Sequence, residues 1–426
     1  MRVLSGFVLA GVLSFGLPVY AQEASPIMMA VGDSLGEGVQ SGDASAATQV
    51  YSYANILAYK IGVPFPLPSI QSGAFGTVGD LTGRSRINPA LRAANLAVSG
   101  ADVGSALRER ADGVMDTETD LVLQPRLGSQ IEIAEQLRPG FVACSIGSND
   151  ALSAVLDFDH LDASQMTSVA QFTADFQEIV QRLKAAGSIV VVSNIPDVTD
   201  IAYLIDRQDL IRFLGSDSGL PAGSYTTVPA MMLVKLGLLS SSVFQDPNYV
   251  LSPAEVTTIR NRIIAFNQVI QQTATAQNMA LADIYGLFKA VAAAKPIVFG
   301  VQLTSRYLGG LFSLDGVHPS NFGHALMATA FISAINVKYG PVVAPLTSGE
   351  LTSLFMTDPF IDRDADGRVA GRPNAGLIET LGPLLGISGD SNEASASTSL
   401  ESGRSGLPAP NVTVEMLLKA FGSKAH

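Results

Sequence analysis

Four short stretches of this 426-residue chain carry side chains that could together perform acyl transfer. Ser34 stands in a Gly-Asp-Ser-Leu stretch, and a serine hydroxyl is a useful nucleophile only when a base removes its proton. Asp315 precedes His318 by three residues, a spacing that can set a carboxylate against Nδ1 of the imidazole and leave Nε2 facing the serine. These two stretches predict a nucleophile, a base and an orienting group.

The other two stretches offer hydrogen-bond donors. Gly100 follows Ser99, and a glycine lets the backbone approach a ligand and point an amide outward. Asn149, in a Gly-Ser-Asn-Asp stretch, can offer its side-chain N–H groups. Donors of this kind stabilise the oxyanion that forms during acyl transfer. Each stretch alone is a common turn, but the four together supply every role that the reaction requires.

The elements that must position these residues follow an alternating pattern. Continuous apolar runs, typical of strands buried on both faces, alternate with stretches of helical spacing. The alternation predicts a three-layer α/β/α fold with a five-stranded parallel sheet, whose carboxyl edge is the usual place for a ligand. The expected strands are 27–31, 93–98, 141–146, 189–193 and 279–284, and the expected helices are 45–61, 127–137, 169–186, 253–277 and 320–339.

In this order, the four stretches resemble those of the SGNH hydrolases, also called GDSL-type esterases/lipases. The resemblance extends over about residues 26–339. It implies a flavodoxin-like fold and a serine hydrolase without metal or organic cofactor. The residues it assigns are Ser34 as nucleophile, His318 as base, Asp315 as orienting group, and an oxyanion hole made by the amides of Ser34 and Gly100 with the side chain of Asn149.

A rival hydrolase fold also fits the first stretch. Residues 32–36 match G-x-S-x-G, the nucleophile elbow of α/β-hydrolases. That elbow follows several earlier strands, one of which supplies an oxyanion donor. The sequence before Ser34 has room for one strand, so the α/β-hydrolase fold is disfavoured.

Composition excludes several other classes of protein. The chain has 26 Lys and Arg against 38 Asp and Glu, a formal charge of -12, without a basic cluster for nucleic acid. Its one cysteine excludes an intramolecular disulfide framework and a Cys-rich zinc site. With 47% hydrophobic residues, most of the chain can fill a core rather than remain disordered.

The two ends differ from the body in composition. Residues 1–21 read as a signal peptide, with Arg2 before an apolar run and a cleavage signal ending at Ala21. A membrane anchor is the alternative, but the run is short for a span. We expect a secreted or periplasmic protein with a hydrolase domain at 22–340 and no transmembrane helix. Residues 341–387 read as a C-terminal extension, and 388–426 as a low-complexity linker with a short terminal helix.

Two segments admit more than one interpretation. Residues 201–250 form an apolar insertion, either helices packed on the core or a lid that lines an acyl-binding site. Asp362, Asp364 and Asp366, with Gly367, have the opening spacing of a calcium loop, but Pro373 stands where the bidentate Glu belongs. That turn is therefore a calcium candidate or an ordinary Asp-rich turn.

The remaining histidines and the cysteine are assigned no catalytic role. We expect His324 to be structural or exposed, because it lies on another face of the last helix than His318. His160, within an acidic stretch, indicates a solvated loop or a metal ligand, and Cys144 a buried strand residue.

The sequence thus favours an exported serine hydrolase of lipid-like or long acyl esters. A carbohydrate O-acetyl esterase with the same triad is the second hypothesis, and a non-catalytic surface or binding protein on the same fold is the third. The expected partner is a small-molecule or lipid ester, with no nucleic acid. The oligomeric state stays open.

Overall fold

The computed structural model describes residues 25–72, 77–372, 382 and 386–387. The expected signal peptide at 1–21 and the expected linker and helix at 388–426 lie outside the described residues. Within the described residues, no helix combines the length and the apolar character that crossing a membrane requires.

Four parallel strands form the central sheet of the described chain, in the order β1 (Met28–Gly32), β4 (Phe141–Ser145), β5 (Ile189–Ser193) and β8 (Ala280–Ala282). Gly32 pairs with Ser145, so β1 and β4 end side by side at the carboxyl edge of the sheet. The strands are almost entirely buried, since helices cover both faces, which explains their continuous apolar sequences. The predicted α/β fold with a parallel sheet is confirmed.

The fifth predicted strand, at residues 93–98, is not confirmed. Residues 93–98 run beside β1 but make only one bridge, between Asn95 and Ala30. The N–H groups of Leu96 and Val98 donate to the carbonyls of Ala30 and Gly32, but the Gly32 N–H bonds Oε1 of Gln130 at 2.8 Å rather than a backbone carbonyl of this segment. Gln130 also donates Nε2 to the Gly32 carbonyl. The glutamine oxygen thus takes the place of one backbone acceptor, and the bridge at Asn95 is not extended into a ladder.

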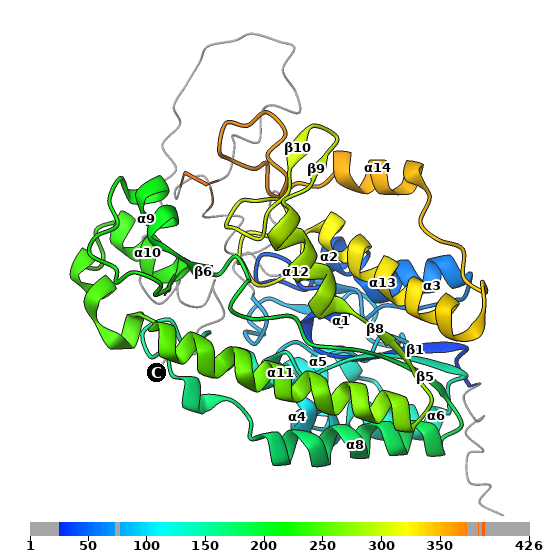
Figure 1. Ribbon diagram of the computed structural model, residues 1–426. Coiled ribbons are helices and arrows are strands. Elements are labelled where there is room, and N and C mark those ends of the chain that lie inside the picture. The colour runs from blue at the N-terminus through cyan, green and yellow to red at the C-terminus, as the bar shows by residue number, and fades with distance from the viewer. Residues whose placement is uncertain (1–24, 73–76, 373–381, 383–385, 388–426) are drawn as a thin grey trace, which may run out of the picture.

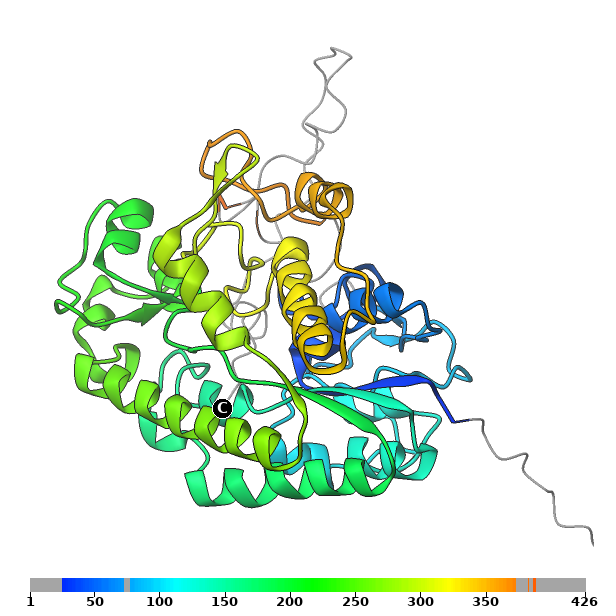
Figure 2. The same cartoon turned by 45° about the vertical axis from the view of Figure 1, so that its right-hand side comes forward.

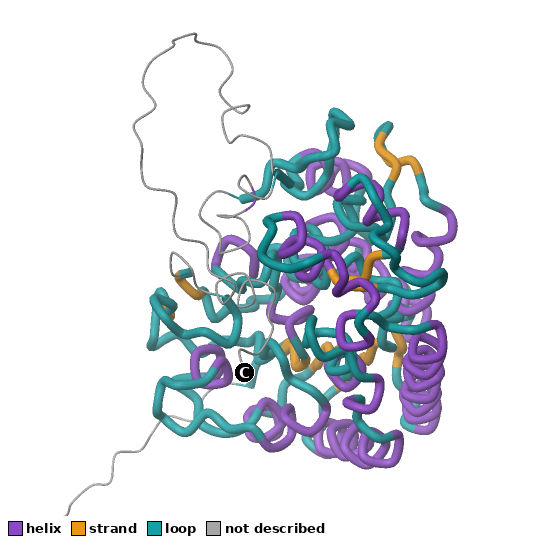
Figure 3. The backbone as a smooth tube through the Cα atoms, turned by 90° about the vertical axis from the view of Figure 1, so that its left-hand side faces the viewer, coloured by secondary structure: helices purple, strands orange, loops and turns teal. Residues whose placement is uncertain are grey.

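Two layers of helices enclose the sheet (Figures 1 and 2). On one face lie α4 (Val103–Arg108), α6 (Gln130–Leu137), α8 (Val169–Ala185) and α11 (Pro253–Ala276). On the other lie α1 (Ser34–Glu37), α3 (Tyr53–Ile61), α12 (Ile284–Ala294) and α13 (Asn321–Tyr339). Figure 3, turned to face the left-hand side of Figure 1, shows that loops make up much of that side.

Local capping explains where the predicted helices begin. Ser168 and Ser252 cap α8 and α11, and Pro253 opens α11, where the missing N–H costs nothing. The predicted helix 45–61 is split into α2 (Ala46–Gln49) and α3, because Ser52 starts a new helix by accepting the N–H of Asn55.

Residues 201–250 fold beside the sheet as short elements. They are β6 (Leu204–Ile205), α9 (Arg207–Leu214), β7 (Thr226–Thr227), α10 (Val228–Lys235) and the 3₁₀ helices η2 (Ser241–Gln245) and η3 (Pro247–Tyr249). Arg306 ties α9 to the body through ion pairs with Asp206 and Asp209. Tyr203 donates its N–H to the Gly316 carbonyl at 2.8 Å.

The remaining elements are small. Beyond α13, α14 (Ser348–Met356) packs against it, and Phe355 joins Phe322 and Ile361 in a separate apolar cluster. The others are β2 (Ile70–Gln71), β3 (Ser85–Arg86), α5 (Glu118–Leu123), α7 (Asn149–Leu152), η1 (Ala163–Gln165), β9 (Ile297–Val298) and β10 (Val301–Gln302).

Candidate active site

Ser34 occupies the first position of α1, two residues after the end of β1. Asp33 caps this helix by accepting the Leu35 N–H at 3.0 Å. The first N–H groups of a helix have no partner inside it, and that of Ser34 bonds no described residue. The Ser34 hydroxyl likewise makes no hydrogen bond to a described residue, and the side chain lies at the carboxyl edge of the sheet. Both groups are therefore free to meet a substrate.

Asp315 and His318 form the hydrogen-bonded pair that their spacing predicts. Nδ1 of His318 lies 2.7 Å from Oδ2 of Asp315. The other carboxylate oxygen, Oδ1, accepts the backbone N–H groups of Val317 and His318. Burial opposes ionisation of Asp315, but the charge of His318 and these hydrogen bonds outweigh it, so the pKa of Asp315 lies below its ordinary value. An ionised Asp315 holds the proton on Nδ1 and leaves Nε2 as an acceptor.

The loop after α1 holds this pair next to Ser34. The Gly42 N–H donates to Oδ2 of Asp315 at 2.7 Å, and the Ser41 N–H donates to Oγ of Ser313 at 2.9 Å. Burial raises the pKa of Asp33, beside Ser34, to about 6, and the charge of His318 opposes that rise. The structure therefore brings the three residues into one region, although Ser34 and His318 do not share a hydrogen bond. Such bonds often tighten only when substrate is present.

Gly100 and Asn149 meet at a single turn. The Ala101 N–H bonds the Val98 carbonyl at 3.1 Å, and Gly100, third in that turn, has a φ of 80°. A type II turn requires a positive φ at this position, which explains the glycine. Nδ2 of Asn149, at the start of α7, donates to the Ala101 carbonyl at 2.8 Å. The Gly100 N–H bonds no described residue and is available to a ligand.

Several residues that support this site carry no motif of their own. Ser313 accepts from Ser41 and donates to the His318 carbonyl, and Gln40 donates Nε2 to Oδ1 of Asn321 at the start of α13. Sequence reasoning missed them because serines and glutamines are common in loops. Glu37 is another, and it gave one usable signal, since an acidic residue interrupts the otherwise small and apolar stretch after Ser34.

The other histidines and the cysteine lie as follows. His324 is fully buried, so of the two predicted possibilities the structural one holds. His160 is exposed in the loop before η1. Cys144 is buried in β4, and burial raises the pKa of its thiol to about 12. None of these three groups is presented to a substrate as a nucleophile or base.

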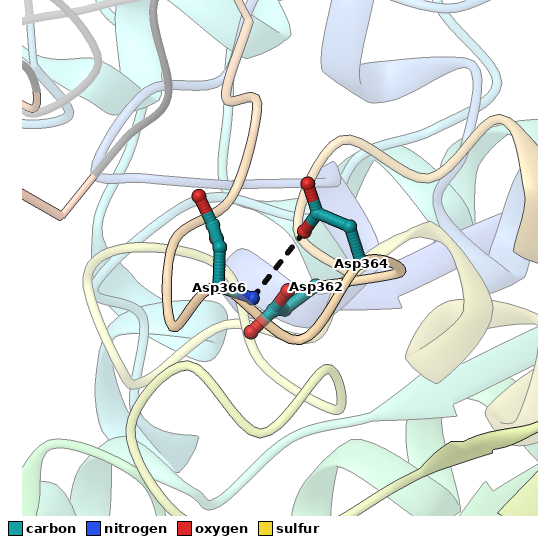
Figure 4. Close-up of side chains that lie close together, drawn as sticks. All are labelled: Asp362, Asp364 and Asp366. Atoms are coloured by element: carbon teal, nitrogen blue, oxygen red, sulfur yellow. Dashed lines mark hydrogen bonds between the residues drawn. The ribbon is translucent and has the colours of Figure 1, made fainter.

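The three aspartates of the C-terminal extension share one turn (Figure 4). Oxygens of Asp362, Asp364 and Asp366 lie within 4.8 Å of one another. The carboxylates also accept backbone N–H groups of the same turn, from Gly367 to Asp362 at 2.8 Å and from Asp366 to Asp364 at 3.5 Å. Their oxygens are the type that calcium prefers, but the same geometry describes a self-satisfied Asp-rich turn.

Comparison with known proteins gives one extensive match. The sequence profile described as GDSL-like Lipase/Acylhydrolase matches residues 28–331, and no curated protein matches the chain. Among solved structures, a GDSL-like lipase from Parabacteroides merdae is 15% identical over 75% of this chain and 100% of its own, with a TM-score of 0.37. A phospholipase A1 from Streptomyces albidoflavus is 17% identical over 74% and 100%, with a TM-score of 0.35. A catalytic mutant of an acetylxylan esterase from Geobacillus stearothermophilus is 15% identical over 74% and 96%, also with a TM-score of 0.35. Structural likeness at these scores is too slight to inform the site.

Proposed function

The chain belongs to the GDSL-like lipase/acylhydrolase family, and we propose that it is an exported serine hydrolase that cleaves carboxylic esters through an acyl-enzyme. One observation carries the proposal. The Asp315–His318 pair is held by Gly42, in the loop that follows the helix bearing Ser34. An imidazole whose Nδ1 proton is held by a carboxylate is the base that a serine nucleophile needs.

The proposed reaction has two halves. In the first, Nε2 of His318 takes the Ser34 proton as Oγ attacks the ester carbonyl, and the tetrahedral intermediate expels the alcohol, which receives that proton. In the second, His318 takes a proton from water as the water attacks the acyl-enzyme, and the returned proton restores the serine as the acid leaves. The oxyanion of both intermediates accepts from the amides of Ser34 and Gly100 and from Asn149.

For the substrate, we propose lipid-like or long acyl esters. The apolar insertion at 201–250 supports this choice, since it lies against the loop that carries Asp315 and His318. Tyr203 bonds Gly316 within that loop, and its hydroxyl donates to the Leu156 carbonyl at 3.1 Å. An insertion attached at this place can form one wall of an acyl-binding site.

A series of p-nitrophenyl esters from acetate to palmitate tests both parts of the proposal. We expect kcat/KM to rise with chain length and hydrolysis to disappear in Ser34→Ala. Activity that survives in Ser34→Ala would contradict the nucleophile. A steep preference for acetate would instead point to removal of acetyl groups from a carbohydrate, and an inactive parent protein to a binding role.

Export is tested separately, because residues 1–21 lie outside the described structure. We expect the protein recovered from the periplasm or medium to begin at Gln22, as N-terminal sequencing would show. A mature chain that still begins at Met1 would contradict the predicted cleavage.

A further inference from the structure

Glu37 is a fully buried carboxylic acid beside the proposed oxyanion turn. It is the last residue of α1, three positions after Ser34. Its Oε2 accepts two hydrogen bonds from one residue, the Ser99 N–H at 2.7 Å and the Ser99 hydroxyl. Ser99 directly precedes Gly100, so Glu37 joins the helix of the nucleophile to the turn that presents the Gly100 N–H.

The orientation of the Gly100 N–H depends on the type of this turn. The peptide between the second and third residues, here Ser99 and Gly100, points in opposite directions in type I and type II turns. The two types are otherwise similar, so an unsupported turn can exchange between them. The structure holds both ends: Glu37 binds Ser99 before this peptide, and Asn149 binds the Ala101 carbonyl after it.

We propose that Glu37 is a positioning residue, which keeps the Gly100 N–H directed at the oxyanion by holding Ser99 through both of its donors. The proposal rests on the proposed function for the identity of the oxyanion. The two hydrogen bonds from Ser99 to Glu37 do not depend on that function. It assigns Glu37 a role in kcat rather than in substrate binding, because the oxyanion forms only during reaction.

The surroundings of Glu37 indicate that it acts as a neutral acceptor. Two charged groups act on it, Arg84 and Glu118. Arg84 pairs with Glu118 through both terminal nitrogens, and its Nε lies 3.6 Å from Asp43. Burial, and then the charge of Glu118, raise the pKa of Glu37 to about 8, against the opposing charge of Arg84. A protonated Glu37 adds no negative charge next to an oxyanion, and a glutamine would reproduce its acceptor oxygen.

The test compares Glu37→Ala, Glu37→Gln and Ser99→Ala on an ester that the parent protein hydrolyses in a Ser34-dependent way. We expect Glu37→Ala to lower kcat at least tenfold with KM within about twofold, since loss of one oxyanion donor costs about a hundredfold or more. Glu37→Gln should keep kcat within about threefold, and Ser99→Ala, which loses only the hydroxyl bond, should fall between them. In addition, the activity of the parent should decline above pH 8, as Glu37 ionises, while Glu37→Gln stays active.

Glu255 provides a matched control. Its Oε2 also accepts the N–H and the hydroxyl of one serine, Ser252, at 2.8 and 2.7 Å, but at the start of α11. Glu255→Ala should therefore lose the same pair of bonds and leave kcat unchanged. An equal drop in both variants would show that Glu37 has only a structural role and would overturn the proposal.

A second measurement separates this inference from the proposed function. The rate of amide hydrogen exchange in the segment 96–103 reports on the hydrogen bonds between Ser99 and Glu37 without any substrate. We expect faster exchange at the Ser99 amide in Glu37→Ala, and near-parent exchange in Glu37→Gln. Unchanged exchange in Glu37→Ala would overturn the inference even if the enzyme is active. Faster exchange in a protein that hydrolyses no ester would instead contradict only the proposed function.

Discussion

Gly42 donates its backbone N–H to Oδ2 of Asp315 at 2.7 Å, and the same oxygen accepts from Nδ1 of His318. One donor is distant in sequence from Asp315 and the other is local. Gly42 lies in the loop after the helix of Ser34, whereas His318 lies at the entrance of α13. One carboxylate therefore ties the loop that follows the nucleophile to the proposed base.

The first prediction concerns the proposed triad. Ser34→Ala and His318→Ala should each lower kcat by about a thousandfold or more, because triad members act as a unit. Asp315→Asn should cost nearly as much, since the amide lacks the charge that holds the Nδ1 proton and its NH2 group would face N–H donors at either position. Ester hydrolysis at saturating substrate measures this. His160→Ala, at an exposed histidine, is the control and should be fully active.

The second prediction concerns the glycine within the Asp315–His318 loop. Gly316 has a φ of 72°, and a Cβ there would lie 2.7 Å from the Tyr203 nitrogen. Gly316→Ala should destabilise the fold by about 2 kcal/mol or more, by strain and by displacement of Tyr203, and should lower kcat.

Gly62→Ala separates these two causes. Gly62 has a φ of 79°, but nothing lies within 4 Å of a Cβ there. This variant should therefore show only the strain, about 1 kcal/mol, with kcat unchanged. Urea unfolding and ester hydrolysis on both variants give the comparison. Equal losses of stability in the two variants would mean that Tyr203 moves aside without reducing the free energy of unfolding.

The third prediction concerns acid stability. Burial, and then the charge of His318, lower the pKa of His324 to about 3 from its ordinary 6.5. The charge of Arg372 also lowers this pKa, whereas the Val39 backbone and the charge of Asp315 raise it. A base with a lowered pKa in the folded state contributes stability that is complete above pH 6.5 and is lost as the pH falls towards 3.

Replacing the imidazole should remove that loss. In His324→Leu, the free energy of unfolding should fall by a few kcal/mol less than in the parent between pH 6.5 and pH 4. Asp33 and Asp358, whose pKa values burial raises to about 6, titrate in the same window, but they are present in both proteins and cancel in the difference. Parallel stability curves would refute the assignment to His324.

The fourth prediction concerns the Asp-rich turn. Because each of its three carboxylates already accepts a backbone N–H, we expect the turn to hold without a metal. Calcium in excess over a chelator should leave the melting temperature of the parent protein unchanged, and titration calorimetry should show no calcium heat. A calcium-dependent rise that is absent in Asp364→Ala would establish a calcium site instead.

Much of the proposed site was predictable because it is local. Asp315 and His318 are three residues apart, and the caps of α8 and α11 are formed by serines that bond N–H groups three residues away. Apolar runs of strand length likewise identified the four strands of the sheet. Such relations depend on short stretches of chain, so residue type and spacing suffice to predict them.

The tertiary structure decided everything that depends on proximity between distant segments. Gly42 meets Asp315 across 273 residues, Glu37 meets Ser99 across 62, and Gln130 bonds the Gly32 N–H across 98. The sequence by itself determined which groups could be nucleophile, base and donors. Packing alone determined what holds Asp315 in place and which carboxylate holds the oxyanion turn, because a buried polar group bonds whatever partner the fold brings near it.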